Sequence, residues 1–140
     1  MKSIKFILAV LVLMAIAGAC TKGNKSSAPE MYEDSELAKL MRTMHDEQLA
    51  VKEAILKGET PESYPASYSH MTTSEPTENM EIGEAFKAYV VLHKASMDNL
   101  ASSDSANLVE NHNLVIQSCV NCHQDHCTGP IEKIEKLYIR

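Results

Sequence analysis

Three segments of the chain repeat their apolar residues at alternating spacings of four and three, a pattern typical of helices that pack in a bundle. The first segment extends from Asp34 to about Lys57. Ser35 is placed to cap its start, and Gly58 is placed to end its last turn. The positions expected to face the interior are Leu37, Met41, Met44, Gln48, Val51 and Ile55.

The second and third segments predict two further long helices. We expect the second helix from about Glu78 to Leu100, and we expect the third to start near Ser103–Ser105. Gly129 and Pro130 should then end one helix and begin a short C-terminal one, with Pro at its first position. The apolar face of the second helix contains Ile82, Phe86, Tyr89, Val90, His93, Met97 and Leu100. The stripe of the third contains Leu108, His112, Val115, Cys119 and Cys122.

Composition supports helices over a sandwich or a barrel. The chain has no Trp, only 5% aromatic residues and eight Met, whereas β-rich folds favour aromatic and β-branched residues. The connection 59–79 holds three of the five prolines, so it has space for one short helix at most. We therefore predict an all-α, four-helix-bundle-like fold with three long helices, a reduced second helix and a short C-terminal helix.

The N-terminal end has the features of a secretion signal. Lys2 and Lys5 precede an apolar run of fourteen residues, Phe6–Ala19, which is short for a membrane span. Small residues lead from there into Cys20, and this arrangement resembles the lipobox of bacterial lipoproteins. The resemblance implies cleavage after residue 19, lipidation of Cys20 and an outer rather than an inner membrane, because Thr21 follows the cysteine. Ala17 departs from the larger aliphatic residue usual there, and simple cleavage that leaves an unmodified Cys20 is the alternative.

We thus expect a signal peptide at 1–19, a lipid-anchored flexible tether at 20–33 and a helical domain at 34–140. Removing the signal leaves eleven basic and nineteen acidic side chains. No basic stripe is present, so nucleic acid is not an expected partner. An acidic domain favours a partner protein with a basic docking face, and the alternative is a solvated surface that only keeps the domain soluble.

Cys119-Val120-Asn121-Cys122-His123 has the C-x-x-C-H spacing of c-type haem attachment. Two cysteines three residues apart project from one face of a helix, so each can form a thioether with one of two vinyl groups. His123 then follows where its imidazole can serve as the proximal iron ligand. The export signal strengthens this interpretation, because c-type haem is attached outside the cytoplasm.

Other chemistry could use the same residues. A thioredoxin-like dithiol expects a βαβ unit, which the pattern does not predict. Structural zinc could take Cys119, Cys122, His126 and Cys127, although adjacent ligands at 126 and 127 are cramped. In an oxidising compartment Cys119 and Cys122 could also form a disulfide.

The haem motif lies on the last long helix, about twenty residues from the C-terminus. This position, the helix order and the first helix, ELAKLMRTMHDEQLAVKEAILKG, resemble the four-helix-bundle cytochromes of the cytochrome c-prime and soluble cytochrome b type. The resemblance implies one covalent haem c and a distal residue from the first helix, with Met41 at the ligand position and Met44 second. Both could instead be core fillers. The short second helix departs from the family and leaves the haem exposure and a family-style homodimer face open.

The remaining histidines are expected to have other roles. His45 is expected at the surface, and His93 is expected to be a hydrogen-bonded interior or haem-edge residue. His112 cannot reach the distal side and is at most a propionate partner. Cys127 is left over as a buried thiol or as a disulfide partner in a dimer.

The function expected from the sequence is electron transfer, without enzymatic activity, by a lipid-anchored monohaem c-type cytochrome in the bacterial periplasm or cell envelope. Its partner would be a redox protein. The alternative is a gas-binding or sensory haem protein of the cytochrome c-prime type with an open distal site. A third alternative is a helical lipoprotein whose cysteines form a disulfide.

Overall fold

Three long helices and two short ones make up the part of the chain that the computed structural model describes, residues 33–61 and 65–140. The expected signal peptide 1–19, the lipidation site Cys20 and most of the tether lie outside these residues. The helices are α2 (Glu36–Leu56), the 3-10 helix η1 (Ser67–His70), α3 (Glu84–Ala101), α4 (Leu108–His126) and α5 (Ile131–Glu135). The described residues contain no strand, so the all-α prediction is confirmed.

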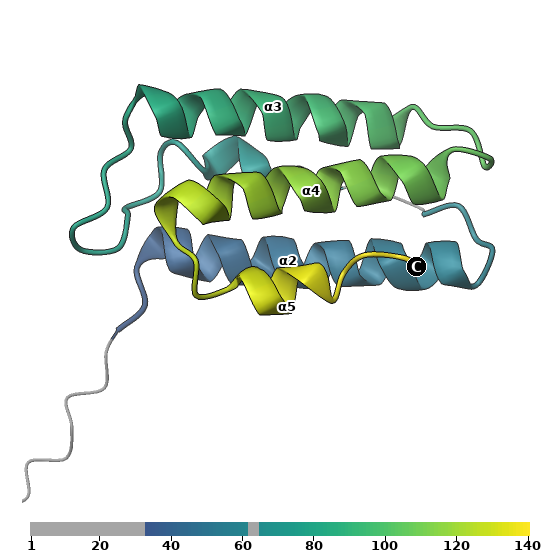
Figure 1. The fold of residues 1–140 in the computed structure, drawn as a ribbon, viewed down its shortest axis with the longest axis horizontal. Helices are drawn as coiled ribbons and strands as arrows, with labels where there is room; N and C mark the ends of the chain where they lie inside the picture. Colours follow the sequence, from purple (N-terminus) through teal and green to yellow (C-terminus); the bar gives the residue numbers. More distant parts are fainter. Residues whose placement is uncertain (1–32, 62–64) are drawn as a thin grey trace, which may run out of the picture. The chain divides into compact units, whose positions relative to one another are not determined.

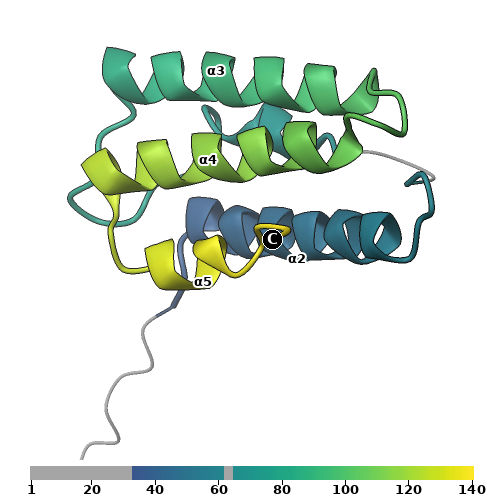
Figure 2. The same ribbon diagram turned by 45° about the vertical axis from the view of Figure 1, so that its right-hand side comes forward.

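The long helices lie side by side within the unit Glu33–Arg140. α4 lies between α3 and α2, and α5 lies beside α2 (Figures 1 and 2). α3 and α4 pack along most of their length, whereas α2 approaches α4 at few points. This uneven packing leaves room between α2 and α4, which α5 borders.

Local sequence signals set both ends of α2. The Ser35 hydroxyl accepts a hydrogen bond from the Ala38 amide at 3.1 Å, as expected for an N-cap. Gly58 has φ of +76°, the left-handed conformation that glycine adopts after a helix at little cost. Four positions of the expected interior stripe are buried, namely Leu37, Met44, Gln48 and Val51.

The second long helix starts at Glu84, not near Glu78 as the pattern predicted. A turn occupies the earlier residues, in which the Met80 amide donates to the Thr77 carbonyl at 3.0 Å. Asn79 has φ of 69° there, a left-handed conformation that a right-handed helix excludes. The short helix η1 is the reduced element expected in the proline-rich connection.

The third long helix also starts later than predicted, at Leu108. The Asp104 carboxylate accepts from the Asn107 amide at 3.0 Å and from its side chain at 2.8 Å, which holds a turn before the helix. Pro130 serves as the N-cap of α5 and not as its first residue, and that helix has only five residues.

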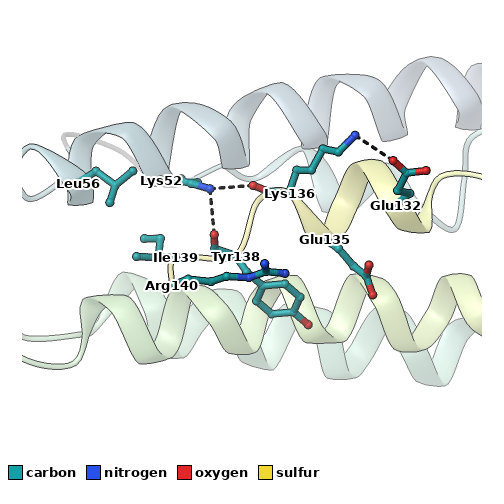
Figure 3. A pocket seen from close by; sticks show the side chains of 8 residues that line it. All are labelled: Lys52, Leu56, Glu132, Glu135, Lys136, Tyr138, Ile139 and Arg140. Atoms are coloured by element: carbon teal, nitrogen blue, oxygen red, sulfur yellow. Dashed lines mark hydrogen bonds and ion pairs between the residues drawn. The ribbon is translucent and has the colours of Figure 1, made fainter.

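The C-terminal segment is fastened to α2 and α4 by polar contacts. Lys52 donates to the carbonyls of Lys136 at 2.7 Å and Tyr138 at 2.9 Å, at the end of α5 (Figure 3). On α4, Asn113 exchanges two 2.9 Å hydrogen bonds with the backbone of Ile139. α5 is therefore held beside the space between α2 and α4, although it is short.

Candidate functional site

A cavity of about 560 Å³ lies between α2, the start of α3, the second half of α4 and α5. This volume is within the range of small-molecule and cofactor sites, about 300–1,000 Å³. The cavity wall brings together all the residues of the helical domain that the sequence singled out for haem binding. These residues are Met41 and Met44 from α2, and Cys119, Cys122 and His123 from α4.

Cys119 and Cys122 are free thiols on adjacent turns of α4. Burial raises the pKa of the Cys119 thiol to about 12 and that of the Cys122 thiol to about 11. In catalytic dithiols the pKa of the nucleophilic thiol is lowered, because the thiolate is the reactive form. The environment of the pair therefore gives no support to thiol redox chemistry.

His123 has a fixed orientation on the cavity wall. Its Nδ1 lies 2.9 Å from the Cys127 carbonyl oxygen, which can only accept, so Nδ1 carries the hydrogen. In the neutral imidazole the lone pair is then on Nε2. Histidines that bind metals usually have this hydrogen bond from their other ring nitrogen. His123 is thus prepared to bind a metal centre through Nε2.

Two buried polar atoms in the cavity lining, one from α2 and one from α4, have no hydrogen-bond partner among the described residues. One is Oε1 of Gln48, whose side chain otherwise donates through Nε2 to the Met97 sulfur at 3.2 Å. The other is Nε2 of His126. The ring of this histidine packs edge-on against the Phe86 ring, with 5.6 Å between the two ring centroids. Unpaired buried polar atoms are rare and costly, and they indicate a place where a bound group or a water supplies the missing contact. The cavity, the paired thiols and the oriented imidazole together fit a covalently attached haem.

Three methionines line the cavity, one more than the sequence suggested. Met44 is 9% exposed and packs in an apolar cluster with Phe86 and Cys122. Met41 is half-buried and packs against this cluster. Met80 comes from the connection before α3, where no periodicity points to an inward position.

The structure corrects one expectation for the histidines. His45 is not a surface residue, because it lines the cavity with only 15% of its side chain exposed. His112 is completely buried on the inward stripe, as the pattern predicted, and its Nε2 is 3.0 Å from the Leu137 carbonyl. Its Nδ1 has no hydrogen-bond partner among the described residues, and His112 does not line the cavity, so its role as a propionate partner stays a prediction.

Two further expectations have mixed outcomes. His93 is an interior residue as predicted, 4% exposed and hydrogen-bonded through Nδ1 to the Ser118 hydroxyl at 2.8 Å. Cys127 is exposed, so the buried-thiol alternative is wrong, and a disulfide partner in a dimer stays a prediction.

The zinc and disulfide alternatives find no support in the geometry. Within residues 33–61 and 65–140, no three His, Cys, Asp or Glu side chains are grouped as metal ligands. Cys119, Cys122, His126 and Cys127 thus do not form the set that zinc would need. Cys119 and Cys122 are not bonded to each other.

His93 should make stability depend on pH. Burial lowers its pKa from 6.5 to about 4, whereas the unfolded chain keeps the ordinary value. As pH falls below about 6.5, the unfolded state binds a proton that the folded state does not, so stability is lost down to about pH 4. The expected loss from this residue is about 3 kcal/mol in the free energy of unfolding.

Chemical denaturation of wild type and His93→Gln at pH 7 and pH 4 measures this effect. Glutamine keeps an amide donor for Ser118 but does not titrate, so the variant should lose less stability between the two pH values. His70→Gln, at an exposed position, is the matched control and should behave as wild type. Equal pH dependence in His93→Gln and wild type would contradict the assignment.

Comparisons with models of protein families, with curated proteins and with solved structures find no match to this chain. Across the described part of the chain, no helix combines the length and the apolar character needed to cross a membrane.

Proposed function

We propose that this chain is an extracytoplasmic monohaem c-type cytochrome that transfers electrons. The observation that supports it most strongly is the cavity shared by Cys119, Cys122 and His123, in which His123 already has the hydrogen bond typical of a metal ligand. A bound haem supplies an iron that cycles between the ferric and ferrous states. The other tasks belong to the residues of the chain.

Cys119 and Cys122 attach the haem. They would hold it through two thioether bonds, one from each sulfur. No oxidant would be needed, so attachment requires only that both thiols stay reduced and face the cavity. Both are free cysteines on its wall.

His123 and a residue of α2 would hold the haem iron from two walls of the cavity. The resemblance to bundle cytochromes implies Met41 as this α2 residue, with Met44 as the less favoured choice, and both line the cavity together with His45 of the same helix. With one protein ligand from each helix, the iron would keep no vacant position and could change its oxidation state without making or breaking bonds. An electron carrier is served by filled coordination positions, whereas a gas sensor needs a vacant position at which the gas binds.

The proposed location is the cell envelope. It is supported by the signal and the lipidation of Cys20 expected from the sequence, with the lipid anchor as the proposed membrane contact. The acidic side chains favour a redox partner with a basic docking face. Neither nucleic acid nor enzymatic turnover enters the proposal, and a homodimer is compatible with it.

Carbon monoxide distinguishes the carrier from the gas-binding alternative. We expect the exported, haem-loaded protein to be low-spin, to be reduced and reoxidised reversibly, and to bind carbon monoxide slowly when reduced. Visible spectra before and after reduction, and after addition of the gas, provide the measurement. High-spin iron that binds carbon monoxide at once would contradict electron transfer and favour gas binding.

A further inference from the structure

His45 lies on the cavity wall that faces α4, although the sequence pattern suggested the surface. Its side chain is 15% exposed, whereas that of its neighbour Asp46 is 74% exposed. It lines the cavity together with Met41 and Met44 from the same helix. The imidazole thus borders the same cavity as both methionines.

A carboxylate orients the His45 ring. Nδ1 of His45 lies 3.0 Å from Oδ1 of Asp46, which accepts the hydrogen bond in its ionised form. Nδ1 therefore carries the hydrogen, and in the neutral ring the lone pair is on Nε2. Among the described residues, Nε2 makes no hydrogen bond.

The same arrangement occurs at His123 on another wall of the cavity. There Nδ1 donates to the Cys127 carbonyl at 2.9 Å, and Nε2 keeps the lone pair. A ring nitrogen bonded to a carboxylate or a backbone carbonyl is the usual companion of a metal-bound histidine. α2 and α4 thus each present one imidazole in the tautomer that binds iron.

No comparable hydrogen bond orients the two cavity methionines of α2. Met44 belongs to the apolar cluster with Phe86 and Cys122, and Met41 packs against that cluster. Apolar packing is what most methionines on a helical stripe provide. Neither sulfur makes a hydrogen bond among the described residues.

We infer that His45, in place of Met41, is the sixth ligand of the haem iron opposite His123. The inference rests on the proposed function, because it assumes the haem at Cys119 and Cys122. Two imidazoles still close the coordination sphere, so the protein remains an electron carrier. We expect its reduction potential to be lower than with a methionine ligand, because methionine stabilises the reduced iron.

Four forms of the exported, haem-loaded protein test the inference: wild type, His45→Ala, Met41→Ala and the exposed control His70→Ala. Absorption and magnetic circular dichroism report the spin state and the charge-transfer band that a thioether on ferric iron produces. We expect low-spin wild type without that band, and no change in the control His70→Ala. Met41→Ala removes the competing ligand candidate, so it should keep low-spin iron without the band if His45 is the ligand. His45→Ala should become high-spin, bind carbon monoxide readily when reduced, and return to low-spin when free imidazole is added.

Each other result identifies what has failed. If wild type shows a thioether band and Met41→Ala removes it, His45 is not the ligand, although the proposed cytochrome remains intact. If His45→Ala does not accumulate, the presence or absence of this band in wild type still decides between the two ligands. High-spin wild type, unaffected by either substitution, would overturn both the ligand and electron transfer. A preparation without haem would overturn the proposed function itself.

Discussion

Replacing Cys119 and Cys122 together by Ala should leave the exported protein without covalently bound haem. The two thiols face one cavity from adjacent turns of α4, and no other cysteine of the described residues shares their helix. Without them no thioether can form, and any haem that enters the cavity is held only by its axial ligands. Denaturing electrophoresis followed by a haem peroxidase stain should show a strong band for wild type and none for the double variant.

Cys127→Ala is the matched control for this experiment. Cys127 also lines the cavity but is exposed and lies outside the C-x-x-C spacing, so its replacement should leave the stained band at wild-type intensity. Each single change at Cys119 or Cys122 should weaken the band, because one thioether remains. A stained band of wild-type strength in the double variant would contradict attachment through these cysteines.

Replacing Cys20 by Ser should move the protein from the membrane fraction to the soluble fraction. The lipid on Cys20 is the only anchor in the proposal, and two or three acyl chains hold a protein stably where one chain gives marginal binding. Cell fractionation with a high-salt wash measures the change. Cys127→Ser should remain with the membrane, which separates the loss of the anchor from the loss of a thiol.

Retention of Cys20→Ser in the membrane after the salt wash would show that the lipid is not the anchor. Release of the unaltered protein would show that Cys20 is not lipidated and that the signal is simply cleaved. Neither result would affect the haem site, because the anchor and the cavity are separate parts of the chain.

The sequence predicted those parts of the fold that depend on local signals. α2 was placed to within two residues at each end, because Ser35 and Gly58 act on their own helix. The starts of α3 and α4 were predicted several residues too early. In both cases the apolar spacing continued, while the backbone was held in a turn at Asn79 or at Asp104, and periodicity carries no signal for these turns.

Some residues of the candidate site could likewise be identified from local sequence, whereas others depend on the fold. The C-x-x-C-H segment is local, so its residues could be identified without the fold. The burial of His45 and the position of Met80 depend on how α2, α5 and the long connection close the cavity, and periodicity within one helix does not encode this. The inward position of His112 was predicted from the stripe, but its partner, the Leu137 carbonyl, could not be predicted because it lies 25 residues away in the sequence.

Intact-protein mass spectrometry of the purified, exported protein tests most directly whether one haem is covalently bound. We expect a red protein whose mass exceeds that of its processed chain by one haem. The added mass should survive denaturation and map to the peptide that contains Cys119 and Cys122. A colourless protein with the mass of the processed chain alone, or with a Cys119–Cys122 disulfide, would contradict the cytochrome assignment.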